Sequence, residues 1–240
     1  MIVYWSAYSE NDTISQFDFD EPSLASKTAN NYVKGLDTAE NFTMCPAFRN
    51  HFNNVYELKF PCDYQLNFNH KDGKTFVETD MYDQTFFDEM LYMRSTQNGL
   101  YSYNVRYMFY CDEPLKITMT PAYFTENDFT KNTMLVSGEF DVGQWFRPLD
   151  CAFKVHDTCT GFNMKKSDAY AYVHFDTDKQ IEFKRFYRSD KIAKLHHDLF
   201  RTRNFRQRKI VPLDYFYKIY NKVRFSKIIK KEIENNLMDE

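Results

Sequence analysis

The sequence predicts a mainly β protein: a single β-sandwich or jelly-roll-like domain followed by a C-terminal α-helical basic tail. Three observations support this fold class. Aromatic residues make up 18% of the 240 residues, with 24 Phe and 18 Tyr, and aromatic side chains favour strands. Short runs of alternating apolar and polar residues recur between turn signals, as in sandwiches and barrels. The apolar period becomes helical after residue 186, close to where the net charge changes sign.

The first strand is predicted at residues 1–8, an apolar segment that lacks the basic flank of a signal peptide and the length of a membrane span. Residues 9–55 are rich in Asn, Ser, Thr and Asp, which predicts loops around the core with a short helix within residues 23–33. Residues 56–60 and 64–68 then alternate with period two, which predicts two strands.

A β-hairpin is predicted at Asp72-Gly73, because Asp-Gly between two alternating runs is a strong signal for a tight primed turn. Residues 101–109 predict one long strand with its aromatic side chains on one face. A second hairpin is predicted from residues 169–175 and 181–186. No helical pattern of crossover length separates these strands, which argues against a parallel α/β fold.

The tail is defined by its charge and its periodicity. Residues 1–183 carry 15 basic and 27 acidic residues, a net charge of −12, whereas residues 184–240 carry 16 and 7, a net charge of +9. Apolar residues at helical spacing predict two amphipathic helices in the tail, broken around residues 209–212. We therefore expect a β-rich domain at residues 1–186 and a helical basic tail at residues 187–240, packed on the domain or extending from it.

The composition argues against several classes of protein. There are only six glycines, and neither a G-x-G-x-x-G nor a Walker sequence occurs, so a Rossmann turn or a phosphate-binding glycine loop is not expected. The five cysteines are odd in number and widely spaced, so we expect reduced thiols in a cytoplasmic protein rather than disulfides or a zinc ribbon. We expect no cofactor and no membrane association.

The triplet His174-Phe175-Asp176 suggests an alternative, a metal site. Jelly-roll oxygenases that use Fe(II) and 2-oxoglutarate begin their two-His-one-carboxylate triad with an H-x-D triplet. A distal His with a basic residue about ten positions later is also needed, and His196 with Arg206 has that spacing. However, His196 follows His174 by only 22 residues and lies in a helix-patterned segment. In the competing interpretation, His174 is an ordinary strand residue and Asp176 begins a turn.

Two further groups of residues are candidates for chemistry. Cys45 is a potential nucleophile with His51 as its base, but a free cysteine is more commonly a small buried hydrophobe. Asp18, Asp20 and Glu21 offer carboxylates to a hard cation. They lack the regular oxygen spacing and the central glycine of an EF-hand, so a solvated acidic loop is the competing interpretation.

The tail interleaves aromatic residues with Arg and Lys, most densely in RTRNFRQRK at residues 201–209. Basic residues contact phosphates and aromatic rings stack on bases, so this pattern predicts nucleic-acid binding. An acidic protein surface is a second possible partner, and docking of the tail on its own acidic body is a third explanation. The candidate binding residues are Arg201, Arg203, Arg206, Arg208 and Lys209.

The segment GEFDVGQWFRPLDCAF at residues 138–153, followed by KSDAYAYVHF at residues 166–175, resembles an uncharacterised protein family of marine tailed phages and bacteria. The resemblance covers roughly residues 45–186 and implies no particular activity. The family has a Gly-Asp-Pro turn where this chain has Ser167-Asp168-Ala169. The leading hypothesis is a non-enzymatic phage-type accessory or binding protein of the host cytoplasm. An iron- and 2-oxoglutarate-dependent oxygenase and a virion structural protein are the alternatives.

Overall fold

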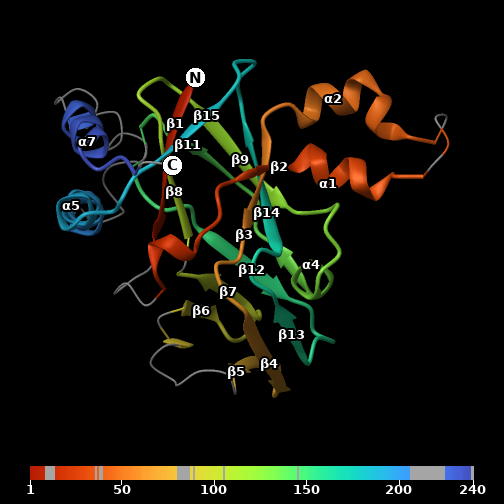
Figure 1. The fold of residues 1–240 in the computed structure, drawn as a ribbon. Coiled ribbons are helices and arrows are strands. Elements are labelled where there is room, and N and C mark those ends of the chain that lie inside the picture. The colour runs from red at the N-terminus through yellow and green to blue at the C-terminus, as the bar shows by residue number, and fades with distance from the viewer. Residues whose placement is uncertain are drawn as a thin grey trace.

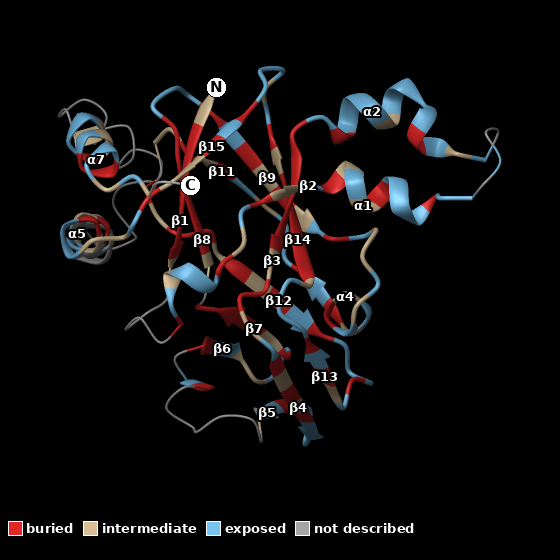
Figure 2. Ribbon diagram, viewed as in Figure 1, coloured by how far each residue is buried: buried red, intermediate tan, exposed pale blue. Residues whose placement is uncertain are grey.

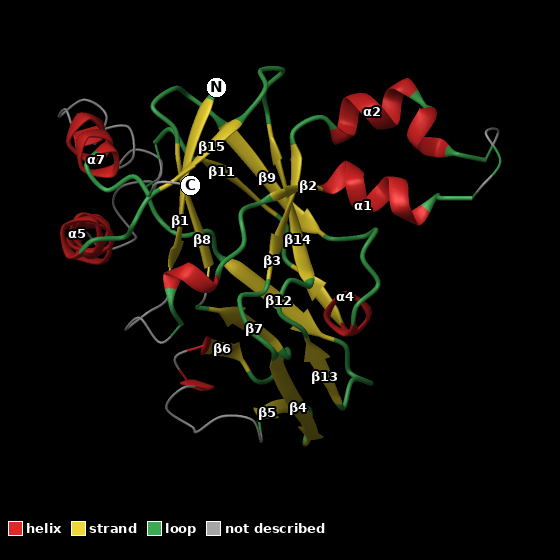
Figure 3. Ribbon diagram, viewed as in Figure 1, coloured by secondary structure: helices red, strands yellow, loops and turns green. Residues whose placement is uncertain are grey.

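The protein is mainly β, and its strands form four sheets around an aromatic core (Figure 1). Figure 3 shows that the longer helices lie outside these sheets. The computed structural model describes residues 1–8, 14–35, 37, 40–79, 87–88, 90–104, 106–144, 146–205 and 225–238, and the backbone alone of residues 198–205.

The N-terminal strand is confirmed and lies at the centre of a three-stranded sheet. The strands of this sheet are β15 (Glu182–Arg185), β1 (Ile2–Tyr8) and β8 (Arg106–Tyr110), in that order. β1 runs antiparallel to β8 and parallel to β15. The predicted hairpin of residues 169–175 and 181–186 is therefore wrong. The strand at residues 169–175 already has a hydrogen-bonded neighbour on each edge, so residues 182–185 pair with β1 instead.

The five-stranded sheet is centred on a strand of seven residues. Its order is β11 (Gly138–Asp141), β9 (Lys116–Pro121), β14 (Ala169–Phe175), β3 (Val55–Lys59) and β2 (Ser23–Leu24). Every pairing in it is antiparallel. Six of the seven residues of β14 are buried, because the strand is covered on both faces.

The other two sheets lie at the lower end of the molecule in Figure 1. One contains β10 (Thr133–Leu135), β12 (Cys151–Val155), β7 (Leu100–Tyr103) and β6 (Leu91–Ser95); the other contains β13 (Gly161–Met164), β4 (Tyr64–Lys71) and β5 (Lys74–Glu78). The predicted hairpin at Asp72-Gly73 is confirmed: it joins β4 to β5 with φ angles of 53° and 70°. Two positive φ angles are what a type I′ turn requires.

Residues 101–109 do not form the single long strand that was predicted. They divide into β7 and β8, which belong to different sheets. The chain departs from β7 at Asn104, whose N–H donates to the carbonyl of Met90 at 2.8 Å. The aromatic side chains of the two strands nevertheless enter the same core, and these are Tyr101, Tyr103, Tyr107 and Phe109. The predicted alternation is therefore correct, but the two halves of the segment pair with strands of different sheets.

The predicted short helix within residues 23–33 is confirmed as α1. The helices are α1 (Ala25–Tyr32), α2 (Pro46–Phe52), α4 (Asp128–Asn132), α5 (Asp190–Phe205) and α7 (Phe225–Glu234), with two 3-10 turns, η2 (Gln16–Asp18) and η3 (Phe42–Met44). Pro46 at the first position of α2 has no N–H to leave unsatisfied, and Asn127 closes a capping box at α4. Most of the second predicted tail helix lies outside the described residues.

The tail packs on the outer face of the sheet that contains β1 (Figure 2). Tyr4, Met108 and Tyr110 project from this face. They are covered by Ile192 of α5 and by Ile229 and Ile233 of α7, together with Phe146 and Phe186 from the body. A backbone hydrogen bond from Met238 N–H to the Arg185 carbonyl, 3.0 Å long, fixes the end of the chain beside β15. Of the two arrangements expected for the tail, the described parts of α5 and α7 show packing on the body.

Candidate functional site

The H-x-D triplet lies at the end of β14. His174 is opposite Val55 of β3 and Thr118 of β9, and its half-buried ring lies 5.8 Å from the ring of His51 on α2. Burial lowers the pKa of His174, and the nearby His51 lowers it further, while Asp176 opposes both effects. The Asp176 N–H donates to the Lys116 carbonyl at 2.9 Å. The structure thus brings His174 beside a histidine that sequence reasoning had considered only as a base for Cys45.

The remaining features of a metal site are not assembled around His174. In the described ranges, no three or more His, Cys, Asp or Glu side chains are grouped so that they can hold a metal ion. His196, the distal histidine of the oxygenase hypothesis, lies on α5 and packs against Tyr8, with ring centroids 5.2 Å apart. Arg206 lies outside the described residues. The two halves of the proposed triad therefore belong to different elements, one in the body and one in the tail.

Cys45 and the acidic residues near Asp18 are the two other groups that the sequence suggested for chemistry. Cys45 is exposed and precedes the first residue of α2. Asp18 forms an ion pair with Lys166 at 3.5 Å, and Asp20 accepts a hydrogen bond from Ser167. These acidic side chains thus hold the turn before β14 against the N-terminal segment.

The predicted binding residues of the tail are only partly described. Arg201 and Arg203 lie in the last turns of α5, where the backbone alone is described. Arg206, Arg208 and Lys209 lie outside the described residues. Within the tail, side chains are described for residues 187–197 and 225–238.

The described tail helices carry lysines on their exposed side. We call Lys194 of α5 and Lys227 and Lys231 of α7 the lysine face: all three are exposed, whereas Ile192, Ile229 and Ile233 of the same helices are buried. Two other lysines of these helices are paired: Lys191 of α5 with Glu232 of α7, within the tail, and Lys230 with Asp112 of the body. The described tail helices therefore pair two of their lysines, while the three of the lysine face are exposed.

Three arginines from distant parts of the sequence meet where the tail crosses the body. We call Arg106, Arg147 and Arg188 the arginine cluster. Arg106 is the register partner of Tyr8, and Arg188 places its guanidinium carbon 5.2 Å from the centre of the Tyr8 ring. Arg147 precedes Pro148, which bridges to Met108 on the same strand as Arg106. All three side chains are half-buried.

The potential within the arginine cluster is positive. Burial lowers the pKa of the adjacent His196 to about 3, and the charges of Arg147 and Arg188 contribute to this shift. The imidazole is therefore neutral at pH 7, because burial and the nearby positive charges both disfavour its protonated form. Burial also lowers the pKa of Arg106, and the carboxylate of Asp150 opposes this shift.

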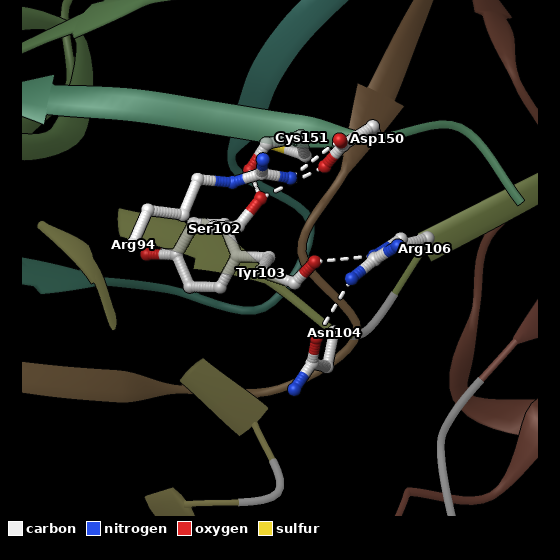
Figure 4. Close-up of polar contacts among 7 residues, drawn as sticks. All are labelled: Arg94, Ser102, Tyr103, Asn104, Arg106, Asp150 and Cys151. Atoms are coloured by element: carbon white, nitrogen blue, oxygen red, sulfur yellow. Dashed lines mark hydrogen bonds and ion pairs between the residues drawn. The ribbon is translucent and has the colours of Figure 1, made fainter. Parts of the chain in front are cut away.

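Figure 4 shows how Arg106 is held in place. Its Nε donates to the carbonyl of Tyr103, and its Nη2 donates to Oδ1 of Asn104 at 2.7 Å. The other guanidinium N–H groups make no hydrogen bond to the described part of the chain. Since a guanidinium has five N–H donors in a planar fork, an oriented Arg106 keeps donors available for an anion.

Asp150 lies near this arginine and is bonded to Arg94 and Ser102 of the neighbouring sheet (Figure 4). The carboxylate pairs with Arg94 of β6, and its Oδ1 accepts a hydrogen bond from the buried Ser102 hydroxyl at 2.9 Å. Burial acts to raise the pKa of Asp150, but Arg106, Arg94 and Ser102 together lower it below its ordinary value. Asp150 is therefore ionised at neutral pH; it pairs directly with Arg94, and its charge favours the protonated form of Arg106.

Sequence reasoning missed the arginine cluster. Arg188 was noticed only as one basic residue of the tail, and Arg106 and Arg147 were not singled out. No local pattern links positions so far apart, because it is strand pairing that brings them together.

Comparison of the chain with protein-family models, with curated proteins and with solved structures finds no match. Among the described helices, none combines the length and apolar character needed to cross a bilayer. The function is therefore inferred from the surfaces of this chain itself.

Proposed function

We propose that this chain is a non-enzymatic, phage-type accessory or binding protein whose partner is polyanionic. The observation that carries the proposal is the orientation of the docked tail. Ile192, Ile229 and Ile233 are buried against the body, while the lysine face points outward. A basic tail needed only to neutralise the acidic body would turn its charges inward, so the outward lysines favour recognition of another molecule.

In this proposal the β-rich body is a scaffold of the β-sandwich or jelly-roll kind, and the tail carries the contact surface. The mainly β fold and the aromatic core support the scaffold role. Five free cysteines and the sequence resemblance to proteins of tailed phages support a role in the host cytoplasm, since thiols stay reduced in that compartment.

The proposal is tested by titrating the intact chain with single-stranded DNA, duplex DNA and a poly-glutamate peptide at two salt concentrations. We expect binding to at least one polyanion, with affinity that falls steeply as salt rises because bound counterions are released. The triple variant Lys194→Gln, Lys227→Gln, Lys231→Gln should bind more weakly. The control triple variant Lys27→Gln, Lys71→Gln, Lys74→Gln removes the same charge from exposed positions on α1 and the β4–β5 hairpin and should bind like the wild type.

Two results would replace this proposal. The absence of binding to any of the three polyanions at low salt would contradict it. About one iron per purified chain, lost in His174→Ala, would support the oxygenase hypothesis instead, and symmetric self-assembly of the purified chain would support a virion role.

A further inference from the structure

We infer that the seam between the body and the tail is a binding site for single-stranded nucleic acid, with a phosphate held by the arginine cluster and a base stacked on Phe17 and Tyr187. The inference rests on the proposed function and names the chemistry of its polyanionic partner. Two independent features of the seam carry it: three arginine side chains around His196 and an exposed pair of aromatic rings.

The arginine cluster has the chemistry of a phosphate site. Its guanidinium groups come from β8, from the segment after β11 and from the segment before α5, so binding there would join the body to the tail. Arginine presents planar, paired donors that match phosphate oxygens, and Arg106 is held in one orientation by Tyr103 and Asn104. The Tyr8 ring under Arg188 fixes the second guanidinium by a cation–π contact.

The aromatic pair lies beside this cluster. Phe17 of η2 and Tyr187 stack with ring centroids 6.2 Å apart and an interplanar angle of 29°, although Phe17 is 62% exposed and Tyr187 43% exposed. The Arg188 N–H donates to Oε1 of Gln16 at 2.7 Å, which ties the segment that carries Phe17 to the segment that carries the arginine. Exposed stacked rings gain by covering a further flat apolar surface, and a nucleobase provides one.

The combination favours single strands over the other polyanions. A duplex keeps its bases stacked on one another, so they cannot reach the Phe17–Tyr187 pair. An acidic protein surface offers carboxylates to the arginines but no flat face for the rings. A flexible single strand presents both a phosphate and an unstacked base within one or two nucleotides.

The test measures the binding of fluorescently labelled oligothymidylate to the intact chain by anisotropy, with inorganic phosphate and poly-glutamate as competitors. Arg147→Gln and Arg188→Gln should each lower the affinity at least about tenfold, and Arg188→Lys should restore only part of it because the paired donors are lost. Phe17→Ala with Tyr187→Ala should cost about tenfold as well, since stacking on one base contributes on that order. Arg49→Gln on the exposed side of α2 is the matched control and should bind like the wild type.

Each outcome decides between the two proposals. If the seam variants, shown to be folded by their unchanged melting temperatures, bind oligothymidylate as well as the wild type while the lysine-face variant does not, this inference is wrong and the proposed function stands. Preferred binding of poly-glutamate would likewise overturn the nucleic-acid assignment alone. A third outcome combines three results: the arginine variants weaken binding, Phe17→Ala with Tyr187→Ala has no effect, and inorganic phosphate competes as strongly as the oligonucleotide. The cluster is then a free-phosphate site, and the stacking role is wrong. If no polyanion binds, both proposals fail.

Discussion

The two faces of the β15-β1-β8 sheet are both buried, but by different means. On the inner face, Trp5, Tyr107 and Phe109 pack into the large aromatic core between the sheets. On the outer face, Tyr4 and Met108 are covered by the two tail helices. The inner core consists of body residues alone, whereas the outer contacts join the body to the tail helices.

The polar groups at the two faces differ as well. The outer face keeps a polar margin: the Tyr110 hydroxyl donates to the Ser226 carbonyl at 3.0 Å, and Asp112 pairs with Lys230 at the rim. An apolar centre with a polar rim resembles a protein–protein interface more than a core. The described tail helices thus pack on the body through Ile192, Ile229 and Ile233 and leave Lys194, Lys227 and Lys231 exposed.

Removing the tail should give the largest effect. A chain that ends at Ser189 exposes Tyr4, Met108, Tyr110 and Phe146 as one apolar patch, and large exposed patches cause aggregation. We expect most of this chain to be insoluble or aggregated by size-exclusion chromatography. The lysine-face variant, which keeps every apolar tail residue, is the control and should stay soluble. A soluble, monomeric chain with an unchanged melting temperature would show that the outer face does not need its cover.

Neighbouring residues on β8 allow the two faces to be compared directly. Phe109 points into the inner core and Met108 to the outer face, and both are fully buried. We expect Phe109→Ala to reduce the free energy of unfolding by about 3–5 kcal/mol and Met108→Ala by about 2–5 kcal/mol, because each leaves a cavity. Urea denaturation measures both. A cost for Met108→Ala within about 0.5 kcal/mol, as for a surface position, would mean that the tail does not cover this face.

The pH dependence of stability tests the seam on its own. His196 is neutral in the folded protein with a pKa of about 3, while in the unfolded chain it takes up a proton below about pH 6.5. The unfolded state therefore binds more protons between these values, so stability falls as the pH falls, by about 2 kcal/mol between pH 7 and pH 5.

His196→Gln should flatten this slope in urea denaturation at several pH values. His174→Gln, at a histidine far from the tail, should keep most of it, although the pKa of His174 is lowered too. Equal slopes for the wild type and His196→Gln would place His196 in solvent rather than in the seam.

A substitution away from both faces should reduce stability least and serves as the reference for the other substitutions. Gly73 has φ +70° and nothing within 4 Å of an added Cβ, so Gly73→Val costs only the strain of a left-handed backbone, about 1–2 kcal/mol. Gly73→Asn should cost less, because Asn tolerates this conformation better. A melting temperature of Gly73→Val equal to that of the wild type would argue against the tight turn.

Local signals allowed part of this structure to be predicted. The Asp72-Gly73 hairpin, α1 and the N-terminal strand all follow from neighbouring residues, and each is confirmed. The strand 101–109 failed because the chain bends at Asn104 and residues 106–110 then pair with β1, a change of partner that alternation cannot reveal. The predicted hairpin of residues 169–175 and 181–186 failed for the same reason, since β15 pairs with β1, at the other end of the β-rich body.

The candidate site was less predictable than the fold. The charge of the tail predicted a basic surface there. The arginine cluster could not be predicted, because it depends on strand register and on the docking of α5. One signal was available: β1 reads IVYWSAY, with apolar residues at almost every position rather than at alternate ones. Such a strand is buried on both faces, so something had to cover the second one.

Native-state hydrogen exchange in increasing urea tests the docked tail most directly, with peptides that cover β1 and α7 followed by mass spectrometry. Since α7 is held to the outer face by buried residues, its amides should open with the same free energy and the same dependence on urea as those of β1. Exchange of α7 at a free energy several kcal/mol below that of β1 would show that the tail leaves the body independently, and would contradict the account given for both the fold and the site.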